Sequence, residues 1–211
     1  MFYIFLGAPG TGKGTVSSEL KDKHNFIHIS TGDLFRNIMK ADSPLSKKIN
    51  ELVNAGNLID DQTTAEVLID ALEKMDLSKN IILDGYPRNL NQTKFLENYF
   101  QEKNINDYKI ISFNLAREEI IQRLSGRRLC PKCGKIYHIK HNPPQVENHC
   151  DLDNETLIIR QDDQPESIKH RLEVFEKQTK PMINLYREQN RLEEINTNKE
   201  LAVIISEVLN V

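Results

Sequence analysis

A glycine-rich string with a single lysine, Gly7-Ala8-Pro9-Gly10-Thr11-Gly12-Lys13-Gly14-Thr15, lies near the N-terminus. The apolar run Phe2–Leu6 before it predicts a strand buried on both faces, and the stretch Lys13–His24 predicts a helix. In this context glycines let backbone N–H groups turn onto phosphate oxygens, the helix N-terminus adds its dipole, and the lysine reaches the β- and γ-phosphates. The string therefore predicts a phosphate-binding loop; a plain glycine-rich turn is the alternative.

The residue after the lysine departs from the strict loop pattern. That pattern has Ser or Thr there, whereas this chain has Gly14, with Thr15 one position later. A hydroxyl ligand for Mg²⁺ is therefore not expected at the usual place. Asp84 ends a second apolar run, Ile81–Leu83, and its carboxylate can hold Mg²⁺ through water. A helix or turn cap is the other interpretation of Asp84.

Further strings follow in order along the chain: Ser30-Thr31-Gly32-Asp33-Leu34-Phe35-Arg36, Leu83-Asp84-Gly85-Tyr86-Pro87-Arg88, and Gly126-Arg127-Arg128 with Asp162-Asp163. With the glycine-rich loop, they resemble the nucleoside monophosphate kinases, and the adenylate kinase family most closely. The resemblance covers the whole chain. It implies reversible, Mg²⁺-dependent phosphoryl transfer, ATP + AMP ⇌ 2 ADP, with these nucleotides as partners.

The resemblance also divides the chain into three parts. It implies a P-loop core of residues 1–29, 60–125 and 164–211, an AMP-binding segment of residues 30–59, and a lid of residues 126–163. A kinase for another nucleoside monophosphate is the alternative within the same chemistry. It would differ in its preference among AMP, CMP, UMP and GMP as acceptors.

Positive charge is what this chemistry needs most, because the reaction brings two polyanions together. The acceptor is itself a phosphate with a second pKa near 6, so we assign no general base. Arginine suits the task because its planar fork binds phosphate through two hydrogen bonds. A solvated surface charge is the alternative for any single arginine. The resemblance implies these catalytic residues: Lys13, Asp84, Arg88, Arg123, Arg127, Arg160 and Arg171. Arg123 and Arg127 would share one face if their helix continued.

The resemblance implies two sets of nucleotide contacts. The ATP contacts are Gly10, Thr11, Gly12, Lys13, Gly14, Thr15, Arg127, Ile136, Tyr137 and Lys199. The AMP contacts are Thr31, Arg36, Asn57, Leu58, Ile59, Gly85, Tyr86, Pro87, Arg88, Gln92, Arg160 and Arg171. It also implies a cis Tyr86–Pro87 bond. The Gln92 amide can pair an adenine edge by donating and accepting, but it would serve another base if flipped. The preference for AMP therefore follows from the resemblance alone.

The three cysteines fall in one short stretch as Cys130-x₂-Cys133 and, after sixteen residues, Cys150-x₂-Asp153. Two such pairs can present four tetrahedral ligands to Zn²⁺, the last through oxygen. Some long-lid adenylate kinases have this Cys₃Asp set, so the resemblance implies structural zinc at Cys130, Cys133, Cys150 and Asp153. The alternatives are redox chemistry at the C-x-x-C pair, a site that has lost its metal, or His149 or His138 as fourth ligand. We interpret His24, His28 and His170 as ordinary surface or packing residues.

Strands and helices must alternate to position these residues. Besides the first strand, we predict strands at Phe26–Ile29, Ile81–Leu83, Lys109–Leu115 and Leu192–Ile195, and Ile81–Leu83 is a continuous apolar run. Helical spacing predicts helices at Lys13–His24, Thr64–Met75, Glu118–Leu124, after Pro165 and at Leu201–Leu209. Ser30, three residues before Asp33, is typical of a helix N-cap. The alternation predicts a mostly parallel, doubly wound α/β sheet of the P-loop type, interrupted by the insert at 126–163.

Composition narrows the class of protein. The chain has 211 residues, 38% of them hydrophobic and 28% charged, which favours one core with a small insertion. A net charge of −3 disfavours a nucleic-acid-binding face. A P-loop switch with a nucleic-acid-binding zinc ribbon stays as the rival class, although acids offset the basic residues of the insert and Tyr137 is its one aromatic residue. Neither a signal peptide nor a membrane span is expected, so we expect a cytoplasmic monomer.

Overall fold

The structure is a computed structural model that describes the backbone of residues 1–211 and every side chain except that of Leu45. The core elements are β1 (Phe2–Leu6), α1 (Lys13–His24), β2 (Ile27–Ser30), α4 (Asp61–Glu73), β3 (Ile81–Asp84), α5 (Leu90–Glu102), β4 (Tyr108–Asn114), α6 (Arg117–Ser125), α7 (Pro165–Val174), the π-helical turn η2 (Phe175–Thr179), α8 (Lys180–Glu188), β7 (Glu193–Asn196) and α9 (Leu201–Leu209). The elements outside it are α2 (Thr31–Ile38), α3 (Pro44–Ala55), β5 (Arg127–Leu129), β6 (Ile136–His138) and the 3₁₀ turn η1 (Gln161–Asp163).

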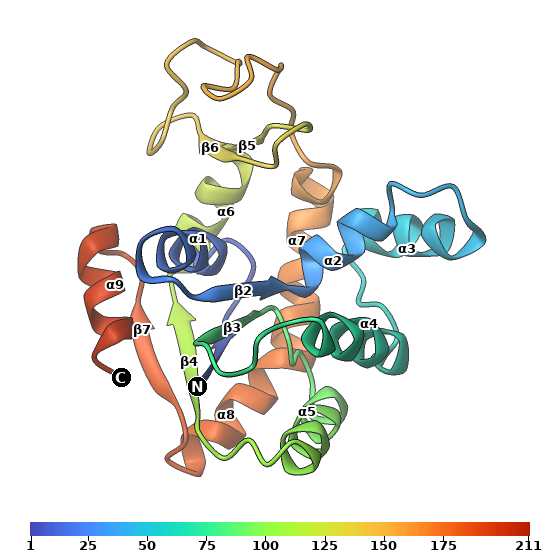
Figure 1. Cartoon of the computed structure of the whole chain (residues 1–211). Helices are drawn as coiled ribbons and strands as arrows, with labels where there is room; N and C mark the ends of the chain where they lie inside the picture. The colour runs from blue at the N-terminus through green and yellow to red at the C-terminus, as the bar shows by residue number, and fades with distance from the viewer.

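A parallel sheet in the order β2-β3-β1-β4-β7 forms the centre of the molecule (Figure 1). Parallel neighbours need crossover connections, and helices provide them here. The predicted α/β class with a mostly parallel, P-loop-type sheet is therefore confirmed. The register aligns Phe5 of β1 and Ser30 of β2 with Asp84 of β3, so the strand ends that precede the loops meet at one edge.

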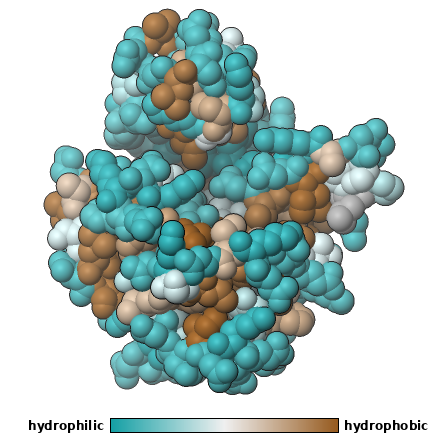
Figure 2. Space-filling view, in the orientation of Figure 1, coloured by the Kyte–Doolittle hydropathy of each residue, from teal (hydrophilic) through white to brown (hydrophobic). Residues whose placement is uncertain are grey.

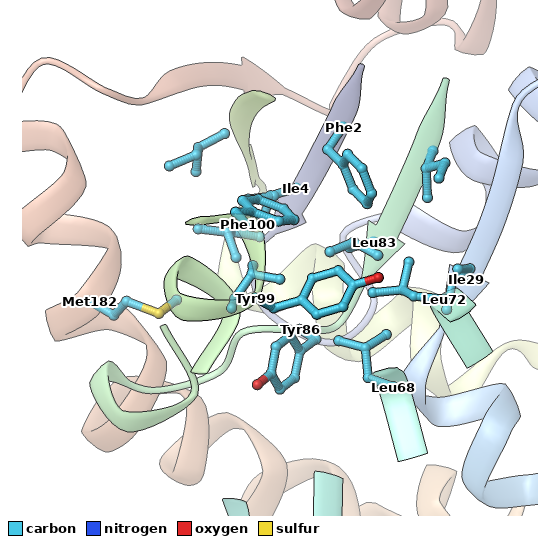
Figure 3. Close-up of a cluster of buried hydrophobic side chains, with 14 of the residues drawn as sticks. Phe2, Ile4, Ile29, Leu68, Leu72, Leu83, Tyr86, Tyr99, Phe100 and Met182 are labelled. Carbon is cyan, nitrogen blue, oxygen red and sulfur yellow. The ribbon is translucent and has the colours of Figure 1, made fainter. Parts of the chain in front are cut away.

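Side chains of β1 alternate between the two faces of the sheet. Phe2, Ile4 and Leu6 pack with residues of α4, α5 and α8, as Figure 3 shows for part of this cluster. Tyr3 and Phe5 pack on the opposite face with residues of α1 and α9. Because helices cover both faces, β1 is apolar along its whole length and β3 is apolar up to Asp84, as the sequence indicated.

Two smaller parts project from the core (Figure 1). The lid contains the antiparallel pair β5–β6 and follows α6. The arm formed by α2 and α3 lies to the other side, and Figure 2 shows a notch between it and the lid lobe. The arm is attached to α7, since Ser167 Oγ donates to the carbonyl oxygen of Asn54 at 3.0 Å.

Two local predictions differ from the structure. Strand β2 begins and ends one residue later than the predicted Phe26–Ile29, because Phe26 packs into the core before the strand pairs with β3. Helix α6 ends at Ser125, and Arg127 begins β5, so Arg123 and Arg127 do not share a helix face. Across the described residues we find no helix with the length and apolarity that a membrane crossing requires.

Candidate active site

The loop between β1 and α1 folds through glycines in left-handed conformations. Gly7, Gly10 and Gly12 have φ values of 134°, 85° and 94°. At Gly10 a Cβ atom would lie 2.8 Å from Cγ of Leu124, so packing against α6 also excludes a side chain. These conformations are strained for other residues, which explains why the loop needs glycine at these positions.

Lys13 is the first residue of α1 and turns back into the loop. Its Nζ donates to the carbonyl oxygens of Gly7 and Ala8, each at 2.9 Å. Burial lowers the pKa of Lys13 to about 8; Asp84 opposes this shift, and nearby arginines add to it. The amino group is therefore held at the loop in a buried environment that disfavours its charged form. A bound anion would favour the charged form.

Asp84 lies at the end of β3, facing the start of α1. Its Oδ2 is 3.6 Å from the position that a Cβ atom of Gly14 would take, and 3.3 Å from Nε2 of His28. Burial alone would raise the pKa of Asp84, but the His28 hydrogen bond and the charge of Lys13 outweigh it and lower the pKa. The ionised Asp84 carboxylate therefore faces the position at which the strict loop pattern has a Ser or Thr side chain.

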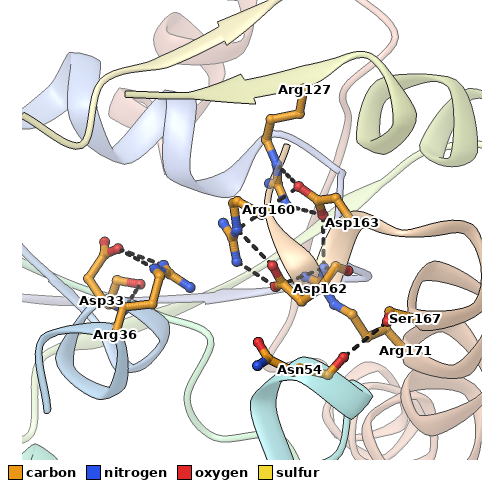
Figure 4. Close-up of polar contacts among 10 residues, drawn as sticks. Asp33, Arg36, Asn54, Arg127, Arg160, Asp162, Asp163, Ser167 and Arg171 are labelled. Carbon is orange, nitrogen blue, oxygen red and sulfur yellow. Dashed lines mark hydrogen bonds and ion pairs between the residues drawn. The ribbon is translucent and has the colours of Figure 1, made fainter. Parts of the chain in front are cut away.

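Arginines from the lid and from α7 converge on two buried carboxylates in η1 (Figure 4). Arg127 donates through Nε and Nη2 to Asp163, at 2.7 and 2.5 Å. Arg160 donates in the same way to Asp162, at 2.8 and 2.5 Å. Arg171 donates through Nη1 to the Asp162 carbonyl oxygen at 2.8 Å and to Asp163 Oδ1 at 3.1 Å.

The charges in this cluster stabilise one another. Burial alone would raise the pKa of Asp162, yet Arg171 and Arg160 hold it at about 2. Burial lowers the pKa of Arg171 to about 10, with Asp162 opposing that shift. The Asp162 carboxylate therefore stays charged near neutrality, and the hydrogen bonds to Asp162 and Asp163 fix the arginines around them.

The remaining predicted arginines lie nearby on separate elements. Arg36 of α2 donates to Asp33 Oδ1, and Figure 4 shows its guanidinium turned toward the Arg160 side of the site. Arg88 Nε donates to the Gly85 carbonyl oxygen at 2.7 Å, while Arg123 Nη2 donates to that of Thr197 at 2.8 Å. The charges of Arg88, Arg127 and Arg171 each lower the pKa of Lys13.

The predicted AMP-side residues gather around the start of α5 and the start of α2. Thr31 Oγ1 donates to the Gly85 carbonyl oxygen at 2.9 Å, and a Cβ atom on Gly85 would lie 2.9 Å from Nη2 of Arg88. The Tyr86–Pro87 bond is cis. Gln92 is 1% exposed and its amide is hydrogen-bonded on both sides, as described below. Asn57, Leu58 and Ile59 form the link between α3 and α4.

The predicted contacts to the ATP base lie on different elements. Ile136 and Tyr137 are in β6, and Lys199 precedes α9, where it pairs with Glu207 at 2.5 Å. The Tyr137 side chain is buried inside the lid, and its Oη accepts from the Asp151 amide at 2.8 Å. The side chain of Tyr137 is thus committed to packing inside the lid.

Cys130, Cys133, Cys150 and Asp153 form one cluster, with a ligand atom of each within 4.8 Å of the others. The Sγ atoms of Cys133 and Cys150 are 3.5 Å apart, and Cys130 Sγ is 3.4 Å from Asp153 Oδ1. Tetrahedral zinc with Zn–S bonds of about 2.3 Å separates its sulfurs by roughly 3.8 Å, so the cluster is close to what zinc needs. The two histidines considered as alternative fourth ligands make other contacts: His149 Nδ1 contacts the Glu147 carbonyl oxygen, and His138 Nε2 contacts that of Gln122.

Sequence patterns missed several residues that the structure brings to the site. His28 was interpreted as an ordinary residue, although its position two before Ser30 on a strand parallel to β3 directs it toward Asp84. Asp162 and Asp163 were seen only as the end of a motif, without a partner for their charge. Asp61, which binds the Gln92 amide, gave no signal of its own because the contact depends on how two helices pack.

Comparison with known proteins gives one family over nearly the whole chain. The family model for adenylate kinase matches residues 5–191. The adenylate kinase of Onion yellows phytoplasma (strain OY-M) is 40% identical over 211 residues, 100% of this chain and 97% of that protein. The adenylate kinase of Thermoanaerobacter sp. (strain X514) is 41% identical over 208 residues, 99% of this chain and 96% of that protein. The adenylate kinase of Staphylococcus aureus (strain Mu50 / ATCC 700699) is 37% identical, covering 100% of this chain and 98% of that protein.

Proposed function

The chain belongs to the adenylate kinase family, and on that premise we propose how its residues share the family's reaction. The protein is a phosphotransferase that converts ATP and AMP reversibly into two molecules of ADP. The observation that carries the assignment of roles is the meeting of Arg127, Arg160 and Arg171 at the carboxylates of Asp162 and Asp163. This cluster is near enough to Lys13 that the charges of Arg127 and Arg171 lower the pKa of the lysine.

The proposed mechanism is positioning and charge neutralisation. Backbone N–H groups of residues 10–15 and the ammonium of Lys13 bind the β- and γ-phosphates of ATP. Arg36 and Arg88 bind the phosphate of AMP, and Arg123, Arg127, Arg160 and Arg171 neutralise the charge that builds up during transfer. An AMP oxygen attacks the γ-phosphorus while the bond to the β-phosphate oxygen breaks. The AMP phosphate needs no base, because it is already ionised near pH 7.

Adenylate kinases use Mg²⁺ with ATP, and we assign its place to Asp84. The ionised carboxylate beside Gly14, a position without a hydroxyl, suits a hydrated ion, with water where other P-loops have a hydroxyl. The ion would neutralise charge on the phosphate oxygens. His28 holds the Asp84 carboxylate by a hydrogen bond from the neighbouring strand.

The lid and the arm would close over the nucleotides. Closure excludes water, which protects the γ-phosphate from hydrolysis and strengthens the charge interactions around it. The backbone of β6 and residues around Lys199 cover the ATP adenine, and Thr31, Gln92 and residues 57–59 receive AMP. All of these groups come from one chain, which supports a monomer as the active form; the cytoplasm remains our proposed location.

In the lid, we assign the Cys₃Asp cluster to structural zinc. Three thiolates and one carboxylate complete a tetrahedral shell, so no coordination position is left for substrate or water. The cluster lies among the few buried residues of the lid, Cys130, Tyr137, Cys150 and Leu157. Its role would then be to fix the fold of a part with little apolar core of its own.

A coupled assay of ADP formation with AMP, CMP, UMP and GMP as acceptors tests the function. We expect AMP to be preferred by orders of magnitude, since a site that hydrogen-bonds one base edge strongly rejects others. Equal turnover of CMP or UMP would instead indicate a different nucleoside monophosphate as substrate.

A further inference from the structure

The side-chain amide of Gln92 is held by hydrogen bonds on both of its ends. Its Oε1 accepts from the backbone N–H of Arg88 at 2.8 Å, and its Nε2 donates to Oδ1 of Asp61 at 2.9 Å. Rotating the amide by 180° would set its NH₂ against an N–H donor and its carbonyl oxygen against a carboxylate. Because Gln92 is 1% exposed, water is in no position to relieve that mismatch. One orientation of the amide is therefore imposed.

Asp61 is itself fixed. It is the first residue of α4, where the helix dipole favours a carboxylate, and α4 lies beside α5, which carries Gln92 (Figure 1). Asn89 Nδ2 donates to the same Oδ1 of Asp61 at 2.8 Å. The Oδ1 of Asn89 in turn caps α5 by accepting from the Gln92 N–H at 2.9 Å. The orientation of the amide thus depends on the packing of two helices.

The amide keeps one unused acceptor site on Oε1 and one unused hydrogen on Nε2, because each end has used half of its capacity. Gln92 is covered in this structure, so a base meets these groups when the residues around the amide move to admit it. With the orientation fixed, Oε1 can receive only a donor and Nε2 can meet only an acceptor. Adenine offers that order along its Watson–Crick edge, with the 6-amino group as donor and N1 as acceptor. Hypoxanthine and guanine offer the reverse, a 6-oxo group and N1–H.

We propose that Asp61 determines base specificity at the AMP site by locking the Gln92 amide in the orientation that accepts 6-aminopurines and rejects 6-oxopurines. Asp61 is a positioning residue, since it acts through Gln92. This inference rests on the proposal that Gln92 contacts the AMP base. It explains why a side chain that could serve either base when free to flip selects one of them here.

The test compares AMP with inosine monophosphate (IMP), which differs only at position 6 and N1, in the parent, Asp61→Ala and Gln92→Ala. The readouts are kcat/KM for each acceptor with ATP, and the dissociation constants of AMP and IMP by calorimetry without ATP. The parent should prefer AMP by a factor on the order of 10⁴. In Asp61→Ala that preference should fall by about ten- to hundredfold, mainly through KM, because one charged hydrogen bond no longer holds the amide.

Two further variants distinguish a loss of the fixed Gln92 orientation from a general loss of stability. Asp60→Ala removes the N-cap of the same helix, where Asp60 Oδ1 accepts from the Thr63 N–H at 2.9 Å, and should lower stability without changing the AMP-to-IMP ratio. Asp61→Asn keeps an acceptor oxygen and should recover most of the ratio lost in Asp61→Ala. A loss in Asp61→Asn as large as in Asp61→Ala would overturn the acceptor role of Asp61.

The outcomes also separate this inference from the site assignment beneath it. If Gln92→Ala loses its preference for AMP while Asp61→Ala keeps the parental ratio within threefold, the lock is wrong and Gln92 remains a base contact. If Gln92→Ala binds AMP and IMP as the parent does, both the lock and the proposed position of the AMP base are wrong.

Discussion

The edge of the parallel sheet and the lid hold their functional groups by different physical means. Lys13 and Asp84 follow strands β1 and β3, whose neighbours fill extensive apolar clusters on both faces of the sheet. In the lid, the buried cluster consists of Cys130, Tyr137, Cys150 and Leu157, and two of these four residues are cysteines. Packing positions the phosphate loop, whereas the lid depends on its proposed metal.

This contrast predicts that substitutions in the two regions will have different effects on activity and on stability. A substitution at Lys13 or Asp84 should reduce phosphoryl transfer and leave the fold intact, because the apolar clusters pack without these charged side chains. A substitution at the cysteine cluster should weaken the lid fold first and reduce turnover only as a consequence.

Lys13→Met should fold normally and lose phosphoryl transfer by about 10²–10³-fold, because one charge on the transferring phosphates is removed. The coupled ADP assay measures the rate, and thermal unfolding checks the fold. Lys21→Met, an exposed position on the same helix, is the matched control and should keep parental activity. Activity of Lys13→Met within threefold of the parent would falsify the role of Lys13.

Raising the pH should weaken ATP binding through Lys13. Its pKa is about 8 in the free protein, below its ordinary value, and bound phosphates favour the charged form. Above pH 8 the free protein has lost the proton that the complex needs, so the dissociation constant of ATP should rise up to about tenfold per pH unit between pH 8 and 9. Calorimetry would measure both this rise and the proton taken up. The same slope in Lys13→Met would assign the effect to another group.

Cys150→Ser, or chelation of the parent, should lower the melting temperature of the lid and release zinc, because binding to the folded cluster contributes folding free energy. At temperatures where the lid remains folded, turnover should stay within severalfold of the parent. Metal analysis with circular dichroism and the ADP assay checks both parts. If turnover disappears while the lid stays folded, the metal takes part in substrate positioning and the contrast between the two regions breaks down.

Asp153→Ala should have the smallest effect on the lid. Water can replace one oxygen ligand more readily than any group replaces a thiolate, so zinc affinity should fall less than in Cys150→Ser. Glu155→Ala, an exposed acid two residues further along the same loop, controls for lost charge. Equal zinc loss in Asp153→Ala and Cys150→Ser would contradict this order.

Much of the fold was predictable from local signals. The strands at the centre are continuous apolar runs, and their predicted limits agree with the structure to within one or two residues. Helices α3, α5 and α8 were not predicted, although α3 has Ser43 as N-cap before Pro44, a recognisable start signal. In α5 the apolar residues Phe95, Leu96, Tyr99 and Phe100 lie at helical spacing, which is also a signal for a helix.

The candidate site was predictable where one short motif carries the chemistry, as in the phosphate loop and the cysteine pairs. It was not predictable where the contact joins elements through tertiary packing. Asp61 meets Gln92 across two helices, and His28 meets Asp84 across two strands. The predicted helix Glu118–Leu124 agrees with α6 to within one residue, but spacing along the helix does not show whether it continues to Arg127. Residues 126–129 in fact leave the helix and pair with other parts of the lid.

The carboxylates of Asp162 and Asp163 have a consequence for the entropy of substrate binding. A free arginine side chain loses up to about 2 kcal/mol of rotamer freedom when it is ordered. Here Arg127, Arg160 and Arg171 are ordered as the chain folds, through bonds that use only part of the five N–H donors of each guanidinium. Incoming phosphates therefore meet donors that are already aligned. The entropy of these side chains is lost when the chain folds, so its loss does not weaken phosphate binding.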